Sequence, residues 1–408
     1  MPASLYEPAE LLDTAANLLP DVVAMRRTIH RHPELGLHLP KTQAAVLDAL
    51  DGLPVEVSTG AALTSITVDL VGTKGEGPTI LLRGDMDALP MPEDADVEYA
   101  SEVAGTMHAC GHDSHTAMLW GAVRLLADRR ADFAGRVRFM FQPGEEGYAG
   151  ARYMIDEGVI DGVDAVWALH VTPNAPSGVI TTRPGPIMAA ANVLRISVVG
   201  QGGHASSPYL ANDPMPVAAE IITALQVFVT RRISTFDPVV ISITNVHGGT
   251  TNNVIPERVD LEGTLRSVSE GSRAKAIKGI ERIVHNIAAA HEMTATFEQV
   301  AGYPVVINDA GFAHFTLDVA HRLLGDSGAF EMPSPVMGAE DFSYLLNERP
   351  GAFAYLGVCP PGVSPAHAHG CHSNRMTIDE PALRNGVAMY CAIALDYLAG
   401  HPSGGSPE

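Results

Sequence analysis

Short runs of β-branched and apolar residues alternate with stretches of helical periodicity along much of the chain. The pattern predicts strands at 62–71, 79–83, 137–142, 165–171 and 352–358. It also predicts helices that begin near Glu7, Ala44, Thr116 and Ala149. Strands interleaved with helices are typical of an α/β fold built in layers.

The segment between about residues 190 and 300 has a different order of predicted strands and helices. Strands are predicted at "NVLRISVVG", "PVVISITNV", "RVDLEGTLRSV" and "MTATFEQV", and helices at 214–232 and 272–291. The order β-α-β-β-α-β is the split βαβ arrangement of ferredoxin-like domains. We therefore expect residues 189–301 to form an inserted α+β domain, and residues 1–188 and 302–408 to form the domain that it interrupts.

Composition agrees with a folded protein of more than one domain. The chain has 408 residues, of which 46% are hydrophobic and 18% charged. Its formal net charge of −21 argues against a nucleic-acid partner, because that affinity rests on lysine and arginine. The charge still permits an acidic small molecule held by a local arginine.

The cysteines and the first residues of the chain indicate the cellular compartment. Four cysteines are too few and too scattered for a disulfide framework, which favours a reducing compartment. The stretch "MPASLYEPAELLDTAANLLP" has acidic residues and prolines where a secretory signal has a basic start and an apolar run. No span approaches the roughly 20 apolar residues that cross a bilayer. We expect a cytoplasmic protein with no membrane partner, and disorder in the tail "GHPSGGSPE".

Polar side chains follow several of the predicted strands. Asp85 and Asp87 in "LLRGDMDALP" come after one strand, Glu145 and Glu146 in "FMFQPGEEG" come after another, and His170 closes a third. In open α/β sheets, ligands bind beyond the carboxyl ends of the strands. We therefore expect these side chains to share one edge of the sheet.

The stretch "MHACGHDSHT", residues 107–116, admits two kinds of chemistry. Cys110 could be a nucleophile with His112 as its base. However, the acidic residues expected at the same edge would raise a thiol pKa unless a cation were present. A divalent ion removes this conflict, because coordination deprotonates the thiol. The residues favour a metal site, and the thiol alternative stays open.

Other histidines and the paired glutamates also have structural interpretations. Lone histidines are more often structural than metal-bound, which applies to His30, His32, His108, His115, His367, His369 and His372. Glu145 and Glu146 alone could be exposed carboxylates at a helix start. Because neighbouring side chains diverge, we expect one to hold a metal and the other to face the substrate.

Ten motifs in order carry a family resemblance: "RRTIHRHPELG", "RGDMDALP", "HACGHDSHTA", "FQPGEEGYAGA", "LHV", "GGHASSP", "NNVIPE", "GTLRS", "GAEDFS" and "CHSN". From about Arg26 to Glu380 the chain resembles the metal-dependent amidohydrolases, which include hippurate hydrolases, aminoacylases and indole-acetyl-amino-acid hydrolases. The resemblance implies a three-layer catalytic domain of the zinc-exopeptidase type. It also implies that the inserted domain is a lid that mediates homodimer formation.

The resemblance assigns roles to residues of this chain. Glu145 matches the family's general base, and the metal ligands it implies are Cys110, His112, Glu146, His170 and His372. Residues that orient these ligands are Asp85, Asp87, Asp113, His115 and Glu340. The site would hold one or two divalent ions. A thiolate suits zinc, whereas imidazole and carboxylate also admit manganese, cobalt or nickel.

The inserted domain supplies candidates for substrate binding. By resemblance, His204 reaches the substrate carbonyl, in dimeric members from the neighbouring subunit, and Asn253 and Arg266 bind substrate. A guanidinium fits the free carboxylate of an amino acid. The chain departs from the family pattern in "LGLHLPKTQ", at Tyr209 and in "HSNRM", and none of these departures touches a predicted ligand.

These observations predict hydrolysis of an N-acyl or N-aroyl amino acid, or a related small amide, to a carboxylic acid and an amino acid. One alternative is a dipeptidase or a deacylase of the succinyl-diaminopimelate type. Another is a non-catalytic protein that binds a metal or ligand on the same fold. Retention of Glu145 beside Glu146 argues against the last, because a binding protein needs the ligand but not the base.

Overall fold

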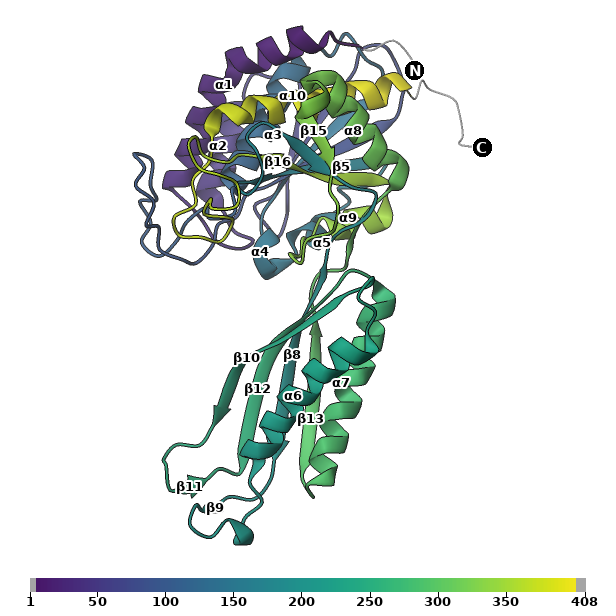
Figure 1. Cartoon of the computed structure of the whole chain (residues 1–408). Coiled ribbons are helices and arrows are strands. Elements are labelled where there is room, and N and C mark those ends of the chain that lie inside the picture. The colour runs from purple at the N-terminus through teal and green to yellow at the C-terminus, as the bar shows by residue number, and fades with distance from the viewer. Residues whose placement is uncertain (1–4, 401–408) are drawn as a thin grey trace. The chain divides into compact units, whose positions relative to one another are not determined.

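The computed structural model describes residues 5–400, so residues 401–408 of the tail expected to be disordered lie outside the described part. The described chain divides into two compact units (Figure 1). The first comprises the chain up to Gly185, Ile307–Pro333 and the chain from Asp341 onward. The second comprises Pro186–Val306, which includes the expected insertion of 189–301, and Ser334–Glu340.

The first unit is built on a sheet that has eight strands among the described residues, in the order β1-β2-β4-β3-β5-β16-β6-β15. Its parallel centre consists of β3 (Thr79–Asp85), β4 (Arg136–Gln142), β5 (Ala165–Thr172) and β16 (Gly351–Gly357). Every residue of β3 and β16 is buried, as expected for parallel strands covered on both faces. The outer strands are β1 (Glu56–Thr59), β2 (Ile66–Val71), β6 (Ile180–Thr182) and β15 (Ala329–Glu331).

Helices cover both faces of this sheet (Figure 1). On one face lie α1 (Pro8–Arg31), α2 (Pro40–Leu50), α3 (His112–Ala127), α8 (Ala310–Leu324) and α10 (Leu383–Gly400). On the other lie the shorter α4 (Glu145–Tyr148), α5 (Gly150–Asp156) and α9 (Ser343–Glu348). The predicted layered α/β fold class is confirmed. No helix within residues 5–400 combines the length and the apolar character that crossing a bilayer requires.

Several predicted boundaries were wrong for local reasons. α3 begins at His112 instead of near Thr116, because the polar residues of its first turn are buried and so do not show an amphipathic pattern. α2 begins at Pro40 instead of near Ala44, since proline is tolerated in a first turn. β2 covers Ile66–Val71 only, and not the whole of 62–71.

The second unit has the split βαβ arrangement. Its antiparallel sheet has the order β10-β12-β8-β13, formed by β8 (Ala190–Val199), β10 (Val239–Gly248), β12 (Arg258–Ser267) and β13 (Thr294–Ala301). The first strand therefore lies between the third and the last. α6 (Pro214–Arg232) and α7 (Glu270–Ala290) pack on the sheet over a separate core. Asp213 and Ser269 cap these helices by accepting backbone N–H groups.

The remaining elements of the described chain are short. The strands are β7 (Gly185–Met188), β9 (Gly203–His204), β11 (Val254–Ile255) and β14 (Val306–Asn308). The 3-10 turns are η1 (Pro208–Leu210), η2 (Asp326–Gly328) and η3 (Glu380–Ala382). β9 and β11 pair with each other, which places the "GGHASSP" and "NNVIPE" segments side by side.

Candidate metal centre

Polar residues gather at one edge of the large sheet because its central strands are parallel. Asp85 is the last residue of β3 and is in register with Gln142, the last residue of β4. His170 lies near the end of β5, and α3 starts beside it with His112. The carboxyl ends of parallel strands are where side chains from separate segments can converge.

Three of the overlapping groups of potential ligand atoms at this edge consist only of the predicted ligands and Glu145. Within each group, the atoms that could hold an ion lie within 4.8 Å of one another. The groups are Cys110 with His112 and His170, Cys110 with Glu146 and His372, and His112 with Glu145 and Glu146. Because they share members, they form one cluster from segments that are far apart in sequence. Its donor set of thiol, imidazole and carboxylate suits a divalent transition metal.

His112 lies among the carboxylates of this cluster. Both ring nitrogens are buried without a hydrogen bond of good geometry, and the nearest carboxylate oxygens are those of Asp87 at 3.4 Å and Asp85 at 3.6 Å. Burial alone would lower the pKa of His112, but Asp85, Asp87 and Glu146 raise it to about 10. Buried ring nitrogens without a hydrogen bond, surrounded by carboxylates that favour a cation, fit a metal ion.

His170 and Cys110 are oriented as ligands. The Nδ1 of His170 donates to the Val171 carbonyl at 2.6 Å, so the lone pair of Nε2 is directed to the Cys110 Sγ at 3.4 Å. Burial, then His115, keeps the pKa of His170 well below its usual value. A hydrogen bond with the Cys371 thiol, then burial, raises the pKa of Cys110. An imidazole held neutral in this way is ready to bind a metal.

Asp87 holds the two neighbouring glutamates in place. Its carboxylate oxygens accept the backbone N–H groups of Glu145 and Glu146, each at 2.9 Å. The Oε1 atom of Glu146 lies 3.1 Å from the Nε2 atom of His372. Glu145 is 6% exposed, and both carboxylates reach the cluster. Asp87 therefore orients the loop that carries both side chains.

His115 and Asp113 are committed to other partners. The Nδ1 of His115 donates to Asp85 at 2.5 Å, while its Nε2 accepts the Val171 N–H at 2.8 Å, so neither nitrogen is available to a metal. Asp113 accepts from Arg26 and His30, both at 2.7 Å, and ties α3 to α1. Both residues therefore hold elements in position.

The second unit contains the remaining predicted residues. His204 and Asn253 are exposed and adjoin, since the Ala205 N–H donates to the Asn253 carbonyl at 3.0 Å. β12 begins at Arg258, directly after β11. Arg266 is half-buried near the other end of this strand. Glu340 is buried and also belongs to this unit. One copy of the unit thus keeps His204 apart from Arg266.

A buried network behind the cluster was not anticipated. Arg83 donates to Gln142 at 2.9 Å, to Asp85 at 2.6 Å and to Asp341 at 3.0 Å. Asp341 also accepts from the Ala151 N–H at 3.0 Å. The signal for this network was an arginine within the apolar run "TILLRGD", because a buried guanidinium requires partners.

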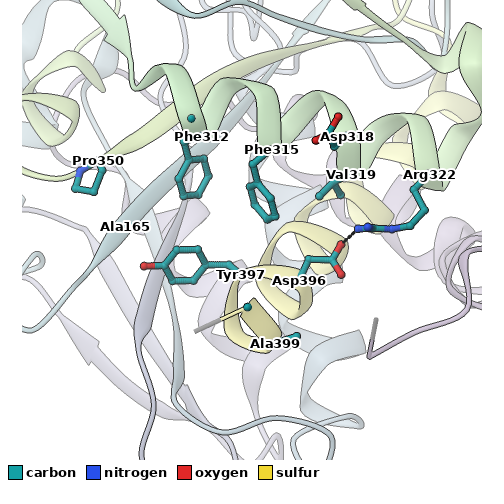
Figure 2. A pocket seen from close by; sticks show the side chains of 12 residues that line it. Ala165, Phe312, Phe315, Asp318, Val319, Arg322, Pro350, Asp396, Tyr397 and Ala399 are labelled. Carbon is teal, nitrogen blue, oxygen red and sulfur yellow. Dashed lines mark hydrogen bonds and ion pairs between the residues drawn. The ribbon is translucent and has the colours of Figure 1, made fainter. Parts of the chain in front are cut away.

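A separate cavity of about 420 Å³ lies between α8 and α10 (Figure 2). Its walls include Phe312, Phe315 and Tyr397, and an ion pair joins Arg322 to Asp396 at one side. None of the clustered ligand residues lines it. The cavity therefore forms no part of the candidate metal centre.

Gly111→Ala is expected to destabilise the first unit and weaken metal binding. Gly111 has φ 88°, and an added Cβ would lie 2.3 Å from Val171 Cγ2, next to His170. Conformational strain alone costs about 1–3 kcal/mol. In urea unfolding, Gly111→Ala should lose more stability than Gly105→Ala, whose φ is 77° with nothing near the new Cβ. Equal losses would contradict a steric role for Gly111.

Comparison with known proteins identifies relatives over most of the chain. The model of peptidase family M20/M25/M40 matches residues 81–396. A Saccharolobus solfataricus protein named thermostable carboxypeptidase 2 is 37% identical, over 92% of this chain and 95% of its own length. A Bacillus subtilis N-acetylcysteine deacetylase is 36% identical (92% and 97%). An Arabidopsis thaliana IAA-amino acid hydrolase, ILR1-like 4, is also 36% identical (92% and 86%).

A solved structure adds information on metal binding. A dinuclear metal-binding peptidase of the M20 family from Bacillus subtilis superimposes with a TM-score of 0.81. It is 33% identical and covers 94% of this chain and 99% of its own. At that identity the likeness extends beyond the fold to a divalent-metal cofactor.

Proposed function

The chain belongs to peptidase family M20/M25/M40 and is a metal-dependent enzyme acting on amide bonds, and from this premise we propose that its substrates are N-acyl or N-aroyl amino acids. Hydrolysis would give a carboxylic acid and a free amino acid. The observation that supports this most is the cluster of thiol, imidazole and carboxylate groups with Glu145 beside it.

We propose Cys110, His112, Glu146, His170 and His372 as the metal ligands. One or two ions of zinc, manganese, cobalt or nickel suit this donor set. A bound divalent ion supplies Lewis acidity, which polarises a carbonyl oxygen and makes water more acidic. Asp85, Asp87 and His115 keep the ligands in orientation through the contacts described above, and Asp113 anchors the helix that carries His112.

Glu145 is the proposed general base and acid. Its carboxylate takes a proton from the attacking water, whose oxygen bonds to the amide carbon, and returns that proton to the leaving nitrogen as the carbon–nitrogen bond breaks. Water is consumed, and its two parts end on the acid and the amine. Burial of Glu145 close to the proposed ligands supports this assignment over an exposed carboxylate.

His204 is the proposed donor to the substrate carbonyl. Its Nδ1 accepts the Ser206 N–H at 3.1 Å and lies 2.7 Å from the Ser206 hydroxyl. This places the proton on Nε2, on an exposed ring that can donate it. The neighbouring Asn253 and the guanidinium of Arg266 are proposed substrate contacts, Arg266 for a free carboxylate.

The separation within the second unit supports a homodimer. His204 and Arg266 lie toward opposite ends of the β8–β12 pair. A small acyl amino acid cannot reach both in one copy, so we propose that a second subunit supplies one of them. We also propose a cytoplasmic location, which the four free cysteines support.

A hydrolysis panel tests the proposed activity. Chelator-stripped protein would be given each divalent metal in turn and then N-acetyl, N-benzoyl and N-indoleacetyl amino acids. Release of free amino acid with at least one metal is expected. The carboxypeptidase name of one relative favours a second candidate, release of the last residue of a short peptide, so peptides belong in the panel. If only the peptides were hydrolysed, the substrates would be short peptides and not N-acyl amino acids.

His204→Ala is expected to reduce kcat about 10²- to 10³-fold, as for other donors to a developing oxyanion. Metal content should stay at the wild-type value, because His204 is not among the clustered ligand atoms. Kinetics and elemental analysis on the same preparation check both parts. His247→Ala, at an exposed histidine in the same unit, is the matched control. Loss of metal from His204→Ala would make it a ligand instead.

A further inference from the structure

Cys371 is a thiol beside the cluster that the proposed reaction does not use. It directly precedes His372, and its side chain is in hydrogen-bonding contact with that of Cys110. Its Sγ also lies 3.8 Å from the carbonyl oxygens of Cys110 and Val171. Both thiols are free. The Cys371 side chain thus contacts Cys110 across a separation of 261 residues along the chain.

The backbone holds this pair together independently of the side chains. The His372 N–H donates to the Ala109 carbonyl at 2.6 Å, so the peptide unit that follows Cys371 is bonded to the one that precedes Cys110. Disulfides need Cα atoms about 4.4–6.8 Å apart. The hydrogen bond joins the peptide unit next to each cysteine, which keeps the two backbones close. This backbone proximity favours a bond between the two side chains.

The other cysteines differ in surroundings. Cys359 and Cys391 are buried, and their thiols donate to carbonyl groups of Val363 and Ala122. Cys371 is half-buried, whereas Cys110 is 8% exposed. An oxidant from solvent therefore reaches Cys371 first, and Cys110 is the adjacent thiol that can resolve the product.

We propose that Cys110 and Cys371 form a reversible disulfide when the metal is absent and a hydroperoxide is present. The Cys371 sulfur attacks hydrogen peroxide, the oxygen–oxygen bond breaks, and a sulfenic acid and one water form. The Cys110 sulfur then attacks the Cys371 sulfur, the sulfur–oxygen bond breaks, and a second water leaves. Both thiol protons end in water, and two electrons pass to the peroxide. A dithiol reductant reverses the change.

The consequence of this bond is loss of metal uptake. It rests on the proposed function in one respect, namely that Cys110 is a ligand. A sulfur in a disulfide is no longer a thiolate, so the oxidised chain could not rebuild the ligand set. Conversely, a bound metal would occupy Cys110 and protect the pair. Oxidation would thus convert the metal-free chain into a form that cannot take up metal, and reduction would restore metal uptake.

The test uses the full chain with and without metal. Stripped and metal-loaded protein would be treated with hydrogen peroxide, digested without reduction and mapped by mass spectrometry. In the stripped protein we expect linked peptides containing Cys110 and Cys371, two hydrogens lighter than their sum, and reduced metal uptake that dithiothreitol restores. In the loaded protein we expect the linked peptides to be at least tenfold less abundant.

Two variants keep the proposal falsifiable. Cys371→Ser should abolish the linked peptides and preserve metal uptake after peroxide, whereas Cys359→Ser should behave as the wild type. Absence of the linkage in stripped wild-type protein would overturn the proposal, as would equal loss of metal uptake in Cys371→Ser. Linkage without any change in metal binding would leave the disulfide standing and contradict Cys110 as a ligand, so the two failures are distinguishable.

Discussion

Glu145→Gln is expected to lower kcat/KM for an N-acyl amino acid by about 10²- to 10⁴-fold, the usual contribution of a positioned general base. The amide keeps the size of the carboxylate but cannot accept the proton of the attacking water. The backbone N–H of Glu145 still donates to Asp87, so the loop should keep its place. Steady-state kinetics with metal-reconstituted protein measure the effect.

Metal content separates this role from that of the neighbouring residue. Glu145→Gln should bind metal as the wild type does, whereas Glu146→Gln should lose affinity, because the Glu146 carboxylate lies against His372. Elemental analysis after dialysis against a fixed metal concentration makes the comparison. Wild-type turnover by Glu145→Gln would remove it from the mechanism. Equal metal loss in both variants would mean that both glutamates are ligands.

Arg83→Met is expected to cost the first unit about 3–5 kcal/mol, the usual effect of removing one partner from a buried ion pair. The Arg83 side chain is 2% exposed and forms ion pairs with Asp85 and Asp341, whose side chains are both fully buried. Without it, the two carboxylates keep their burial and lose their cation. Urea unfolding followed by a probe in the first unit measures the loss, because two units need not unfold together.

Arg136→Met is the matched control on the same sheet. Its side chain is 40% exposed and its guanidinium lies 3.4 Å from Asp69, so its removal should cost about 1 kcal/mol or less. Arg83→Met should also weaken metal binding, since Arg83 holds the Asp85 carboxylate that orients His115. If both variants lost the same stability, the buried network around Arg83 would not stabilise the first unit more than an exposed ion pair does.

The fold was predictable where the pattern repeats over a whole element. The second unit shows this, because its long strands alternate and α6 covers the expected span, 214–232. α10 lacked such a signal. The residues from Gly386 to Leu395 in "LRNGVAMYCAIALDYLAG" are all buried, so no polar face marks the helical period there. β6 and β15 are too short for any pattern to identify.

The chemistry of the site was predictable by residue type, but its contacts were not. Sequence places His112 and His115 in one motif, but it does not show that His115 uses both ring nitrogens in hydrogen bonds and that His112 uses neither. Which nitrogens are occupied depends on the ends of β3 and β5. The contact of Cys371 with Cys110 similarly arises from tertiary structure, although both residues lie in motifs.

Anomalous X-ray diffraction at the absorption edge of the bound metal tests the central claim most directly. Crystals of the reconstituted full chain should show a peak about 2.0–2.3 Å from ligand atoms of the set Cys110, His112, Glu146, His170 and His372. Glu145 should lie beside that peak without bonding to it. A peak bounded by other residues, or one that leaves Cys110 and His112 uncoordinated, would contradict the account.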